Sequence, residues 1–255
     1  MTDGVETQRT AFEETYGASG RTRWAFHYTD DPLTRYLRDR RLKTALRTLE
    51  ALGHLDAADQ SVLVVCGGVG GEGTFLRRFG FREVTVSDFS TEALELCRRF
   101  DPHLKTHLLD AEQMDLPASS YDIVLVQDGL HHLPRPVLGF TEMLRVAREA
   151  VVVIEPHEGL VGRMIGTEWE IQGEAVNYVF RWNRGFLEQC TRSYLLSKDV
   201  KVVVNRLWDH NSVVAKLVSR LVPPLRLSAA RLVYAALRPV ASAGNMMVGV
   251  IIKHG

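Results

Sequence analysis

A glycine-rich segment, residues 67–73, has the residue types and spacing of a cofactor-binding loop. It follows a short apolar run and precedes a helical pattern, so its glycines can turn the chain sharply and let the backbone approach a ligand. A helix that begins at such a turn favours negative groups at its N-terminus. Gly68, Gly70 and Gly73 fit the GxGxxG spacing of a dinucleotide site, with Asp88 about twenty residues further on. The segment therefore predicts a site for a nucleotide-like cofactor.

The same segment also fits a second glycine spacing, which leaves an oxidoreductase open. Gly67, Gly71 and Gly73 match the GxxxGxG of short-chain dehydrogenases, and Tyr194 and Lys198 match that family's YxxxK. However, a long segment precedes the first predicted strand, and no serine stands at the family's usual distance before Tyr194. Tyr194 also falls on a predicted amphipathic helix, where it can be a core residue. An NAD(P)-dependent short-chain oxidoreductase is therefore the weaker alternative.

Apolar runs alternate with helical patterns between residues 61 and 156. Short, nearly all-apolar runs are typical of strands in a parallel sheet that helices cover on both faces. The predicted strands span 61–65, 84–87, 104–109, 121–126 and 151–154, and the predicted helices 74–79, 90–99 and 137–149. Ligands of such sheets collect at the carboxyl ends of the strands. The polar residues at those ends are Asp88, Asp110, Gln127, Asp128 and Glu155.

An amphipathic helix is predicted before this core. Asp31 and Pro32 have the residue types of an N-cap and a first helical position, and the helix ends near Gly53. We expect its arginines to form a solvated face. After the core come an aromatic-rich stretch at 159–182, a helix at 185–197 and strands at 200–204 and 246–252.

Residues 61–156 resemble the class I methyltransferases that use S-adenosylmethionine, in the type 11 group that acts on small molecules. The matching features are the glycine segment, Asp88, Asp110-Ala111 and the run Tyr121–Pro134, in which the strand is followed by His131-His132. The resemblance implies an α/β fold with a doubly wound, seven-stranded, mostly parallel Rossmann-like sheet. It also implies a helical N-terminal lid, an insertion after the fifth strand and an antiparallel last strand.

The predicted organisation of the chain has four parts. They are a helical N-terminal lid at 1–55, a cofactor-binding core at 56–158, a substrate-recognition insertion with its helix at 159–198, and strands and helices that complete the sheet at 199–255.

The resemblance implies S-adenosylmethionine as the cofactor. Asp88 would accept hydrogen bonds from both ribose hydroxyls, and Asp110 would contact the adenine amino group. The predicted cofactor-binding residues are Gly67, Gly68, Gly70, Asp88, Phe89, Asp110, Ala111, Met114, Gln127 and Tyr28. The chain departs from the family where Val64 and Cys66 replace the usual acid and first loop glycine. Because that acid helps to hold the methionine ammonium, either another residue takes its role or cofactor affinity is lower.

Two histidines follow the fourth predicted strand, on the side where the acceptor would bind. The resemblance implies that His131 and His132 contact the substrate or act as a base, and an imidazole titrates near neutral pH. The predicted substrate-binding residues are His157, Tyr178, Arg181 and Trp182. Their single arginine suits an anionic or sugar-like acceptor. The acidic cluster of cation-dependent catechol methyltransferases is missing from the sequence, so we predict no metal.

We therefore predict an S-adenosylmethionine-dependent methyltransferase. The sulfonium of the cofactor is already an activated leaving group, so the main tasks of the protein are to align the reactants and to exclude water. The predicted acceptor atom is an oxygen or nitrogen of a small molecule, such as a natural-product or sugar intermediate. A regulatory protein that binds the cofactor without methylating is the alternative, because the usual acid is lost at position 64.

The composition restricts the partners and the compartment. Lys plus Arg and Asp plus Glu both number 31, which gives no electrostatic case for nucleic acid. Three separated cysteines give no disulfide framework and fit a reducing cytoplasm. The N-terminus lacks the apolar core of a signal peptide, and no apolar run approaches ~20 residues. We therefore expect a cytoplasmic protein with a small-molecule acceptor.

Residues 216–238 contain two basic amphipathic segments around Pro223-Pro224. Such helices can rest on a membrane surface. We expect them instead to pack on the sheet or to form a homodimer interface, without membrane contact.

Overall fold

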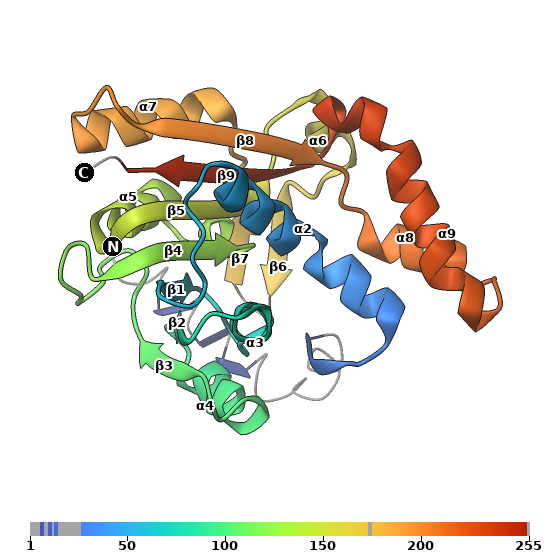
Figure 1. The fold of residues 1–255 in the computed structure, drawn as a ribbon, viewed down its shortest axis with the longest axis horizontal. Helices are drawn as coiled ribbons and strands as arrows, with labels where there is room; N and C mark the ends of the chain where they lie inside the picture. Colours follow the sequence, from blue (N-terminus) through green and yellow to red (C-terminus); the bar gives the residue numbers. More distant parts are fainter. Residues whose placement is uncertain (1–5, 8–9, 12, 15–26, 173–174, 254–255) are drawn as a thin grey trace.

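The computed structural model describes residues 6–7, 10–11, 13–14, 27–172 and 175–253 of the chain. A seven-stranded sheet runs through these residues in the order β3-β2-β1-β4-β5-β9-β8 (Figure 1). Its strands are β1 (Ser61–Val65), β2 (Glu83–Asp88), β3 (Lys105–Leu108), β4 (Tyr121–Gln127), β5 (Ala147–Pro156), β8 (Lys201–Leu207) and β9 (Met246–Ile252). Strand β9 is antiparallel to β5 and β8, and the other neighbouring pairs are parallel. The predicted fold class is confirmed.

Helices cover both faces of the sheet, because its central strands are apolar and buried on both sides. The helices are α2 (Pro32–Ala51), α3 (Gly71–Phe79), α4 (Thr91–Phe100), α5 (Pro136–Val146) and α7 (Arg184–Leu195). On one face, α2, α3 and α4 contribute Leu46, Leu76 and Leu94 to the core. On the other face, α5 and α7 contribute Met143 and Leu187. Strand residues alternate between these two cores, as the pleat of a strand requires.

Helix α2 begins where the sequence predicted it. The side chain of Asp31 accepts a hydrogen bond from the Thr34 N–H at 2.8 Å, and Pro32 is the first helical residue. The expectation that all its arginines are solvated is wrong, since the side chains of Arg38 and Arg41 are only 8% and 11% exposed. Each is buried against a carboxylate, which compensates the guanidinium for its lost water.

Two differences from the predicted elements concern the stretch between β4 and α7. The predicted helix at 137–149 ends at Val146, and Ala147 already pairs with Tyr121 in the sheet. Pairing with a buried neighbour strand here outweighs the helix propensity of an Ala-Arg-Glu run. The insertion contains a short helix and a hairpin that the sequence did not predict, which are α6 (Leu160–Ile165), β6 (Trp169–Gln172) and β7 (Ala175–Tyr178).

A helical hairpin follows β8 and extends away from the sheet (Figure 1). It consists of α8 (Asn211–Val218) and α9 (Pro223–Ala236), and a 3-10 turn, η2 (Arg238–Ala243), leads on to β9. Its buried residues Val214, Val218 and Tyr234 pack against Leu37 of α2 rather than on the sheet. Among the described residues, no helix combines the length and apolar character that a membrane crossing requires.

Candidate active site

The glycine segment connects β1 to α3 with several residues in the left-handed backbone region. Gly70 has a φ of +83°, and a Cβ added to it would lie 2.4 Å from Sγ of Cys97. A side chain at this position would have to displace the Cys97 side chain and adopt a strained backbone conformation. Cys66, at φ +53°, stands where the family has its first glycine. A left-handed conformation costs a non-glycine residue about 1 kcal/mol, so the loop keeps its shape at Cys66 despite the substitution.

Asp88 connects the end of β2 to the glycine segment. Its Oδ2 accepts the Gly68 N–H at 2.8 Å, and its Oδ1 accepts the Ser90 N–H at 2.9 Å. Burial raises the pKa of Asp88, against the lowering effect of these backbone hydrogen bonds. Ser90 itself caps α4 through the Ala93 N–H. Asp88 is therefore not a helix cap, and each of its oxygens keeps a lone pair for further donors such as ribose hydroxyls.

The next strand end along the sheet carries the predicted adenine contacts. Asp110 is exposed, and its Oδ1 accepts the Glu112 N–H at 2.8 Å. Ala111 and Met114 are buried in the core directly after it. Because β3, β2 and β1 are neighbours, Asp110, Asp88 and the glycine segment lie at adjacent strand ends. Phe89 follows Asp88 and is half-buried.

Gln127, at the end of β4, pairs with an acid that sequence reasoning missed. Its Nε2 donates to Oε1 of Glu72 in the first turn of α3 at 2.8 Å. Its own Oε1 is buried without a hydrogen-bond partner among the described residues. An unsatisfied buried acceptor beside a carboxylate is suited to an ammonium group. Val64, at the position of the usual acid, is buried in the core.

Tyr28 reaches the glycine segment from the N-terminal side. Its hydroxyl donates a hydrogen bond to the Val69 carbonyl, and its ring stacks on Phe100 at a centroid distance of 4.6 Å. Burial raises the pKa of Tyr28, so it remains a neutral donor. Residues 15–26 of the predicted lid lie outside the described residues.

His131 and Glu155 form a buried pair at the ends of β4 and β5. His131 lies in the 3-10 turn η1 (Leu130–His132), and its Nδ1 is 2.6 Å from Oε2 of Glu155. The other oxygen of Glu155 accepts the N–H groups of Gly129 and Leu130 at 2.8 and 2.7 Å. Burial lowers the pKa of His131, but the attraction of Glu155 outweighs it and raises the pKa to about 9. The carboxylate therefore fixes both the turn and the imidazole.

The β6–β7 hairpin lies against this pair. Asn177 donates to the His131 carbonyl at 2.6 Å, and the His131 and His132 rings are 4.2 Å apart between centroids. One oxygen of Glu170 is 3.9 Å from His131 Nε2 and 3.7 Å from His132 Nδ1. Among the described residues, these two histidines and Glu170 are the group whose ligand atoms lie close enough, within 4.8 Å, to hold a metal ion.

The predicted substrate-binding residues have different surroundings. His157 is buried beside Arg206, and burial together with that cation lowers its pKa to about 4, so it is neutral at physiological pH. The Tyr178 side chain is half-exposed and meets Trp169 edge-on at 5.1 Å. Arg181 donates to the Thr167 carbonyl at 2.6 Å.

The interpretation of Trp182 as a pocket wall is wrong for this structure. Its side chain is fully buried and packs edge-on against Phe140 and Phe180 at 5.4 and 5.0 Å. Trp182 also belongs to the core cluster between the sheet, α5 and α7. Its position gives it a packing role in the core.

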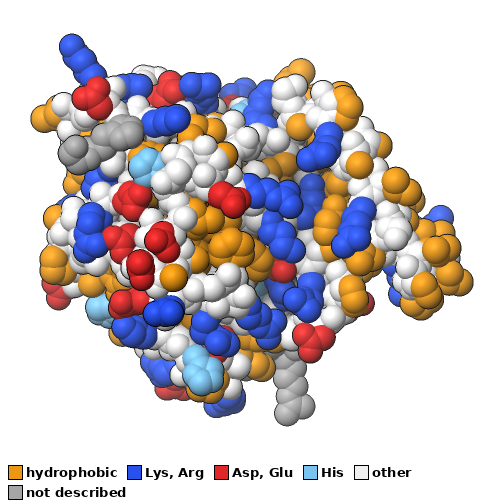
Figure 2. Space-filling model, in the orientation of Figure 1, with side chains coloured by type: hydrophobic (Ala, Val, Ile, Leu, Met, Phe, Trp, Pro, Cys, Tyr) orange, Lys and Arg blue, Asp and Glu red, His pale blue; other side chains and the backbone are white. Residues whose placement is uncertain are grey.

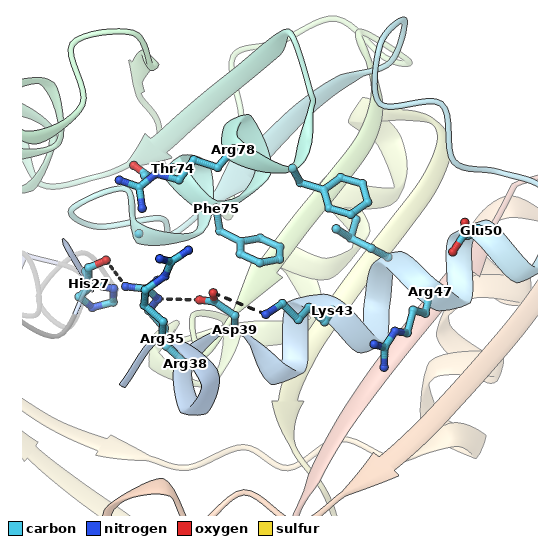
Figure 3. A pocket seen from close by; sticks show the side chains of 13 residues that line it. His27, Arg35, Arg38, Asp39, Lys43, Arg47, Glu50, Thr74, Phe75 and Arg78 are labelled. Carbon is cyan, nitrogen blue, oxygen red and sulfur yellow. Dashed lines mark hydrogen bonds and ion pairs between the residues drawn. The ribbon is translucent and has the colours of Figure 1, made fainter. Parts of the chain in front are cut away.

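A cleft of about 460 Å³ lies between α2 and α3, beside the glycine segment (Figure 3). His27 borders it so closely that a Cβ added to Gly71 would lie 2.3 Å from the His27 ring. The charged residues that line it are Arg35, Arg38, Lys43, Arg47, Arg78, Asp39 and Glu50. Asp39 pairs with Arg38 at 2.7 Å and lies 3.9 Å from Lys43, so basic residues remain in excess. The cleft favours anionic groups.

Comparison with known proteins identifies the core. Residues 63–154 match the family model described as a methyltransferase domain. Residues 63–154 are thus a methyltransferase domain, and the fold around them is that of class I methyltransferases that use S-adenosylmethionine. The match spans β1 to β5 and therefore includes Asp88, Asp110 and Gln127. The comparison with curated proteins found no matching sequence.

Solved structures share the fold of this methyltransferase at low sequence identity. A SAM-dependent methyltransferase from Thermotoga maritima is 16% identical with a TM-score of 0.59, and the alignment covers 96% of this chain and 99% of that one. Magnesium protoporphyrin IX methyltransferase from Synechocystis PCC 6803, solved with bound SAM, is 13% identical with a TM-score of 0.57, and 97% of each chain is covered. The cyclase SpnF is 14% identical with a TM-score of 0.52, over 83% of this chain and 81% of that one. The fold thus occurs with different acceptors and reactions.

Proposed function

We propose that this methyltransferase transfers the methyl group of S-adenosylmethionine to an oxygen or nitrogen atom of a small molecule, of the natural-product or sugar-intermediate class. The observation that carries the proposal is the buried pair of His131 and Glu155 at the end of β4. A hydroxyl or amine loses a proton when it is methylated, and a histidine held by a carboxylate is suited to take that proton.

The strand-end residues fit the cofactor from one end to the other. Asp88 keeps lone pairs for the ribose hydroxyls, and exposed Asp110 is free to accept from the adenine amino group. Gln127 and Glu72 fit the methionine ammonium, since the orphaned Gln127 oxygen has no partner among the described residues. When bound, S-adenosylmethionine supplies a methyl group on a cationic sulfonium, which needs no further activation. Glu72 would then replace the missing acid at Val64.

His131 can receive the acceptor's proton only on Nε2, because Nδ1 is held by Glu155. Glu155 cannot turn away, since its second oxygen is fixed by Gly129 and Leu130. The carboxylate also stabilises the imidazolium that proton transfer produces. Nε2 faces the β6–β7 hairpin, where Glu170 lies. We therefore place the acceptor between η1 and this hairpin, with Tyr178 and Arg181 as the candidate contacts.

Two measurements on the full chain test the proposal. Calorimetry with S-adenosylhomocysteine and with NAD(P) should show binding of the former alone. Mass spectrometry of a panel of hydroxyl and amine compounds incubated with S-adenosylmethionine should show the gain of one methyl group. Binding of the cofactor without methylation of any panel compound would favour the regulatory alternative and contradict the proposal.

A further inference from the structure

The α8–α9 hairpin ends in an apolar tip that faces solvent. We call Leu221, Val222, Pro223, Pro224 and Leu225 the hairpin tip. Its three non-proline side chains are 39–60% exposed. Further exposed apolar side chains continue from the tip along both helices, namely Val213, Leu217 and Leu232. Contiguous exposed apolar side chains of this kind mark an interaction surface.

The backbone of the hairpin tip is largely satisfied from within. Pro223 and Pro224 have no N–H, and the N–H groups of Leu221 and Leu225 bond to carbonyls of the same turn at 3.0 Å. Arg226 donates to the Leu221 and Ser219 carbonyls at 2.9 and 3.1 Å. Burying an unpaired polar group is costly, so a turn with its groups already paired can leave water at low cost.

The hairpin that carries this apolar surface is also positively charged. Residues 211–238 contain five cations and neither Asp nor Glu, and the cations are Lys216, Arg220, Arg226, Arg231 and Arg238. Beside α9 lies a hollow lined by Arg40, Lys43, Arg47, Arg206, Arg231 and Arg238, with no acid among its described lining residues. Figure 2 shows Lys and Arg side chains gathered next to the end of the molecule where apolar side chains are exposed. Arg220 and Arg226 thus lie next to the hairpin tip in the sequence, and the hollow adds positive charge at the C-terminal half of α9.

The hairpin is packed on the rest of the molecule. Its inner residues pack on α2, and the Arg40 guanidinium lies 3.2 Å from the centroid of the Tyr234 ring. Tyr234 also donates to Asn211 at 2.8 Å, which joins α9 to α8. Because these contacts already position the hairpin, its tip is presented at a lower ordering cost when it binds.

We propose that the α8–α9 hairpin docks this enzyme on a membrane surface rich in anionic lipids. The hairpin tip enters the headgroup region, and the surrounding Lys and Arg side chains contact lipid phosphates. A second copy of the chain fits this surface less well. A two-fold interface brings the same patch of both copies together, so the cations of one copy would face those of the other. Anionic headgroups complement both the charge and the apolar tip.

Vesicle sedimentation with the full chain tests this proposal. We expect the protein to sediment with vesicles of phosphatidylcholine and phosphatidylglycerol, and to do so weakly with phosphatidylcholine alone. The Val222→Ser/Leu225→Ser double variant should lower the partition coefficient at least about tenfold, because it removes apolar area from the tip. Lys216→Gln and Arg220→Gln should each lower the partition coefficient about fivefold. High salt should also lower it, because it screens the attraction between these cations and the lipids.

Leu196→Ser is the matched control, because Leu196 is 90% exposed but follows α7, away from the hairpin. It should bind vesicles like the wild type, and thermal melting should confirm that every variant is folded. Wild-type protein that ignores phosphatidylglycerol, or a double variant that still binds, would overturn the proposal. So would a dimer in sedimentation equilibrium that the same double variant dissociates. Binding is measured without acceptor or cofactor, so the result is independent of the methyl-transfer proposal.

Discussion

The Nδ1 atom of His131 lies 2.6 Å from Oε2 of Glu155, and both side chains are buried at the ends of neighbouring strands. Gly129 and Leu130 hold the second oxygen of Glu155, so the carboxylate fixes the turn that carries His131 and orients its imidazole. The pair therefore controls which nitrogen of His131 exchanges a proton and at which pH it does so. Two predictions depend on this relationship.

The rate of methyl transfer should rise with pH. The pKa of His131 is about 9, so at neutral pH most of its population is imidazolium and cannot act as a base. Below pH 9, the rate should increase about tenfold for each pH unit and level off above it. His131→Gln should lower kcat about 10²-fold or more and remove this dependence, while S-adenosylhomocysteine binding remains. An identical pH profile in the variant would show that another group provides the base.

Glu155→Gln should move the pH profile and remove part of the stability. Without the carboxylate, burial is opposed only by the weaker attraction of Asp128 and Glu170, so the pKa of His131 falls and the rise in rate moves to lower pH. In the wild type, the folded pKa of about 9 lies above the ordinary 6.5. The pair therefore stabilises the fold fully below pH 6.5 and loses that contribution as pH rises through 9, which amounts to about 3 kcal/mol. Urea unfolding across this range should show the decline in the wild type and a flatter curve in the variant.

Glu149→Gln is the matched control for that variant. Glu149 lies at the opposite end of β5 and also contacts a histidine, His54, at 2.6 Å. Its loss should affect stability without moving the pH dependence of methyl transfer. A similar shift in both variants would mean that the shift follows from general destabilisation of β5 rather than from the His131–Glu155 contact.

The strands of the core could be predicted from the sequence because each buried strand is a short run of mainly apolar residues. The runs at 61–65 and 246–252 are continuous and apolar, and both predicted strands agree with β1 and β9. The nucleoside side of the site could be predicted for a related reason. Asp88 and Asp110 directly follow such strands, and parallel strand ends meet at one edge.

The remaining parts of the site depend on contacts between distant residues. Glu155 is 24 residues from His131, and nothing in its local sequence distinguishes it from other polar residues at strand ends. Glu72 could be read only as an acid in the first turn of a helix. The β6–β7 hairpin has exposed apolar and aromatic residues on both strands, so it shows no buried face from which a strand could be predicted. Arg41 was placed on a solvated face because its partners Asp128 and Asp209 come from distant segments.

Asp88→Asn should weaken cofactor binding. The carboxylate can accept hydrogen bonds from ribose while it holds Gly68 and Ser90, but an amide has one oxygen and two donor hydrogens. Hydrogen bonds to a charged partner contribute about 1.5–3 kcal/mol, which predicts about a 10- to 100-fold higher Kd for S-adenosylhomocysteine. Asp122→Asn is the control. The Asp122 carboxylate also accepts a hydrogen bond from a backbone N–H, that of Ser61, but this contact lies at the amino end of β1. Equal losses in both variants would indicate damage to the sheet rather than to a ribose contact.

Methyl transfer should persist after treatment with EDTA. His131, His132 and Glu170 are arranged closely enough to hold a metal ion, yet a sulfonium donor needs no Lewis acid for its leaving group. The assay compares initial rates before and after chelation and after addition of Mg²⁺, Mn²⁺ or Zn²⁺. A rate that falls on chelation and returns with one of these ions would assign the three residues to a metal site and remove His131 as the base.

Glu72→Gln should separate the two ends of the cofactor site. Glu72 accepts from Gln127 at 2.8 Å beside the orphaned Gln127 oxygen, whereas Val64 contributes no charge at the position of the usual acid. Removing the carboxylate should raise the Kd for S-adenosylhomocysteine about tenfold, because the methionine ammonium loses a charged partner. Adenosine lacks the methionine part, so its binding should not change. Calorimetry with both ligands on both proteins provides the comparison. If adenosine binding weakens equally, Glu72 acts by holding the glycine segment and not by binding the ammonium group.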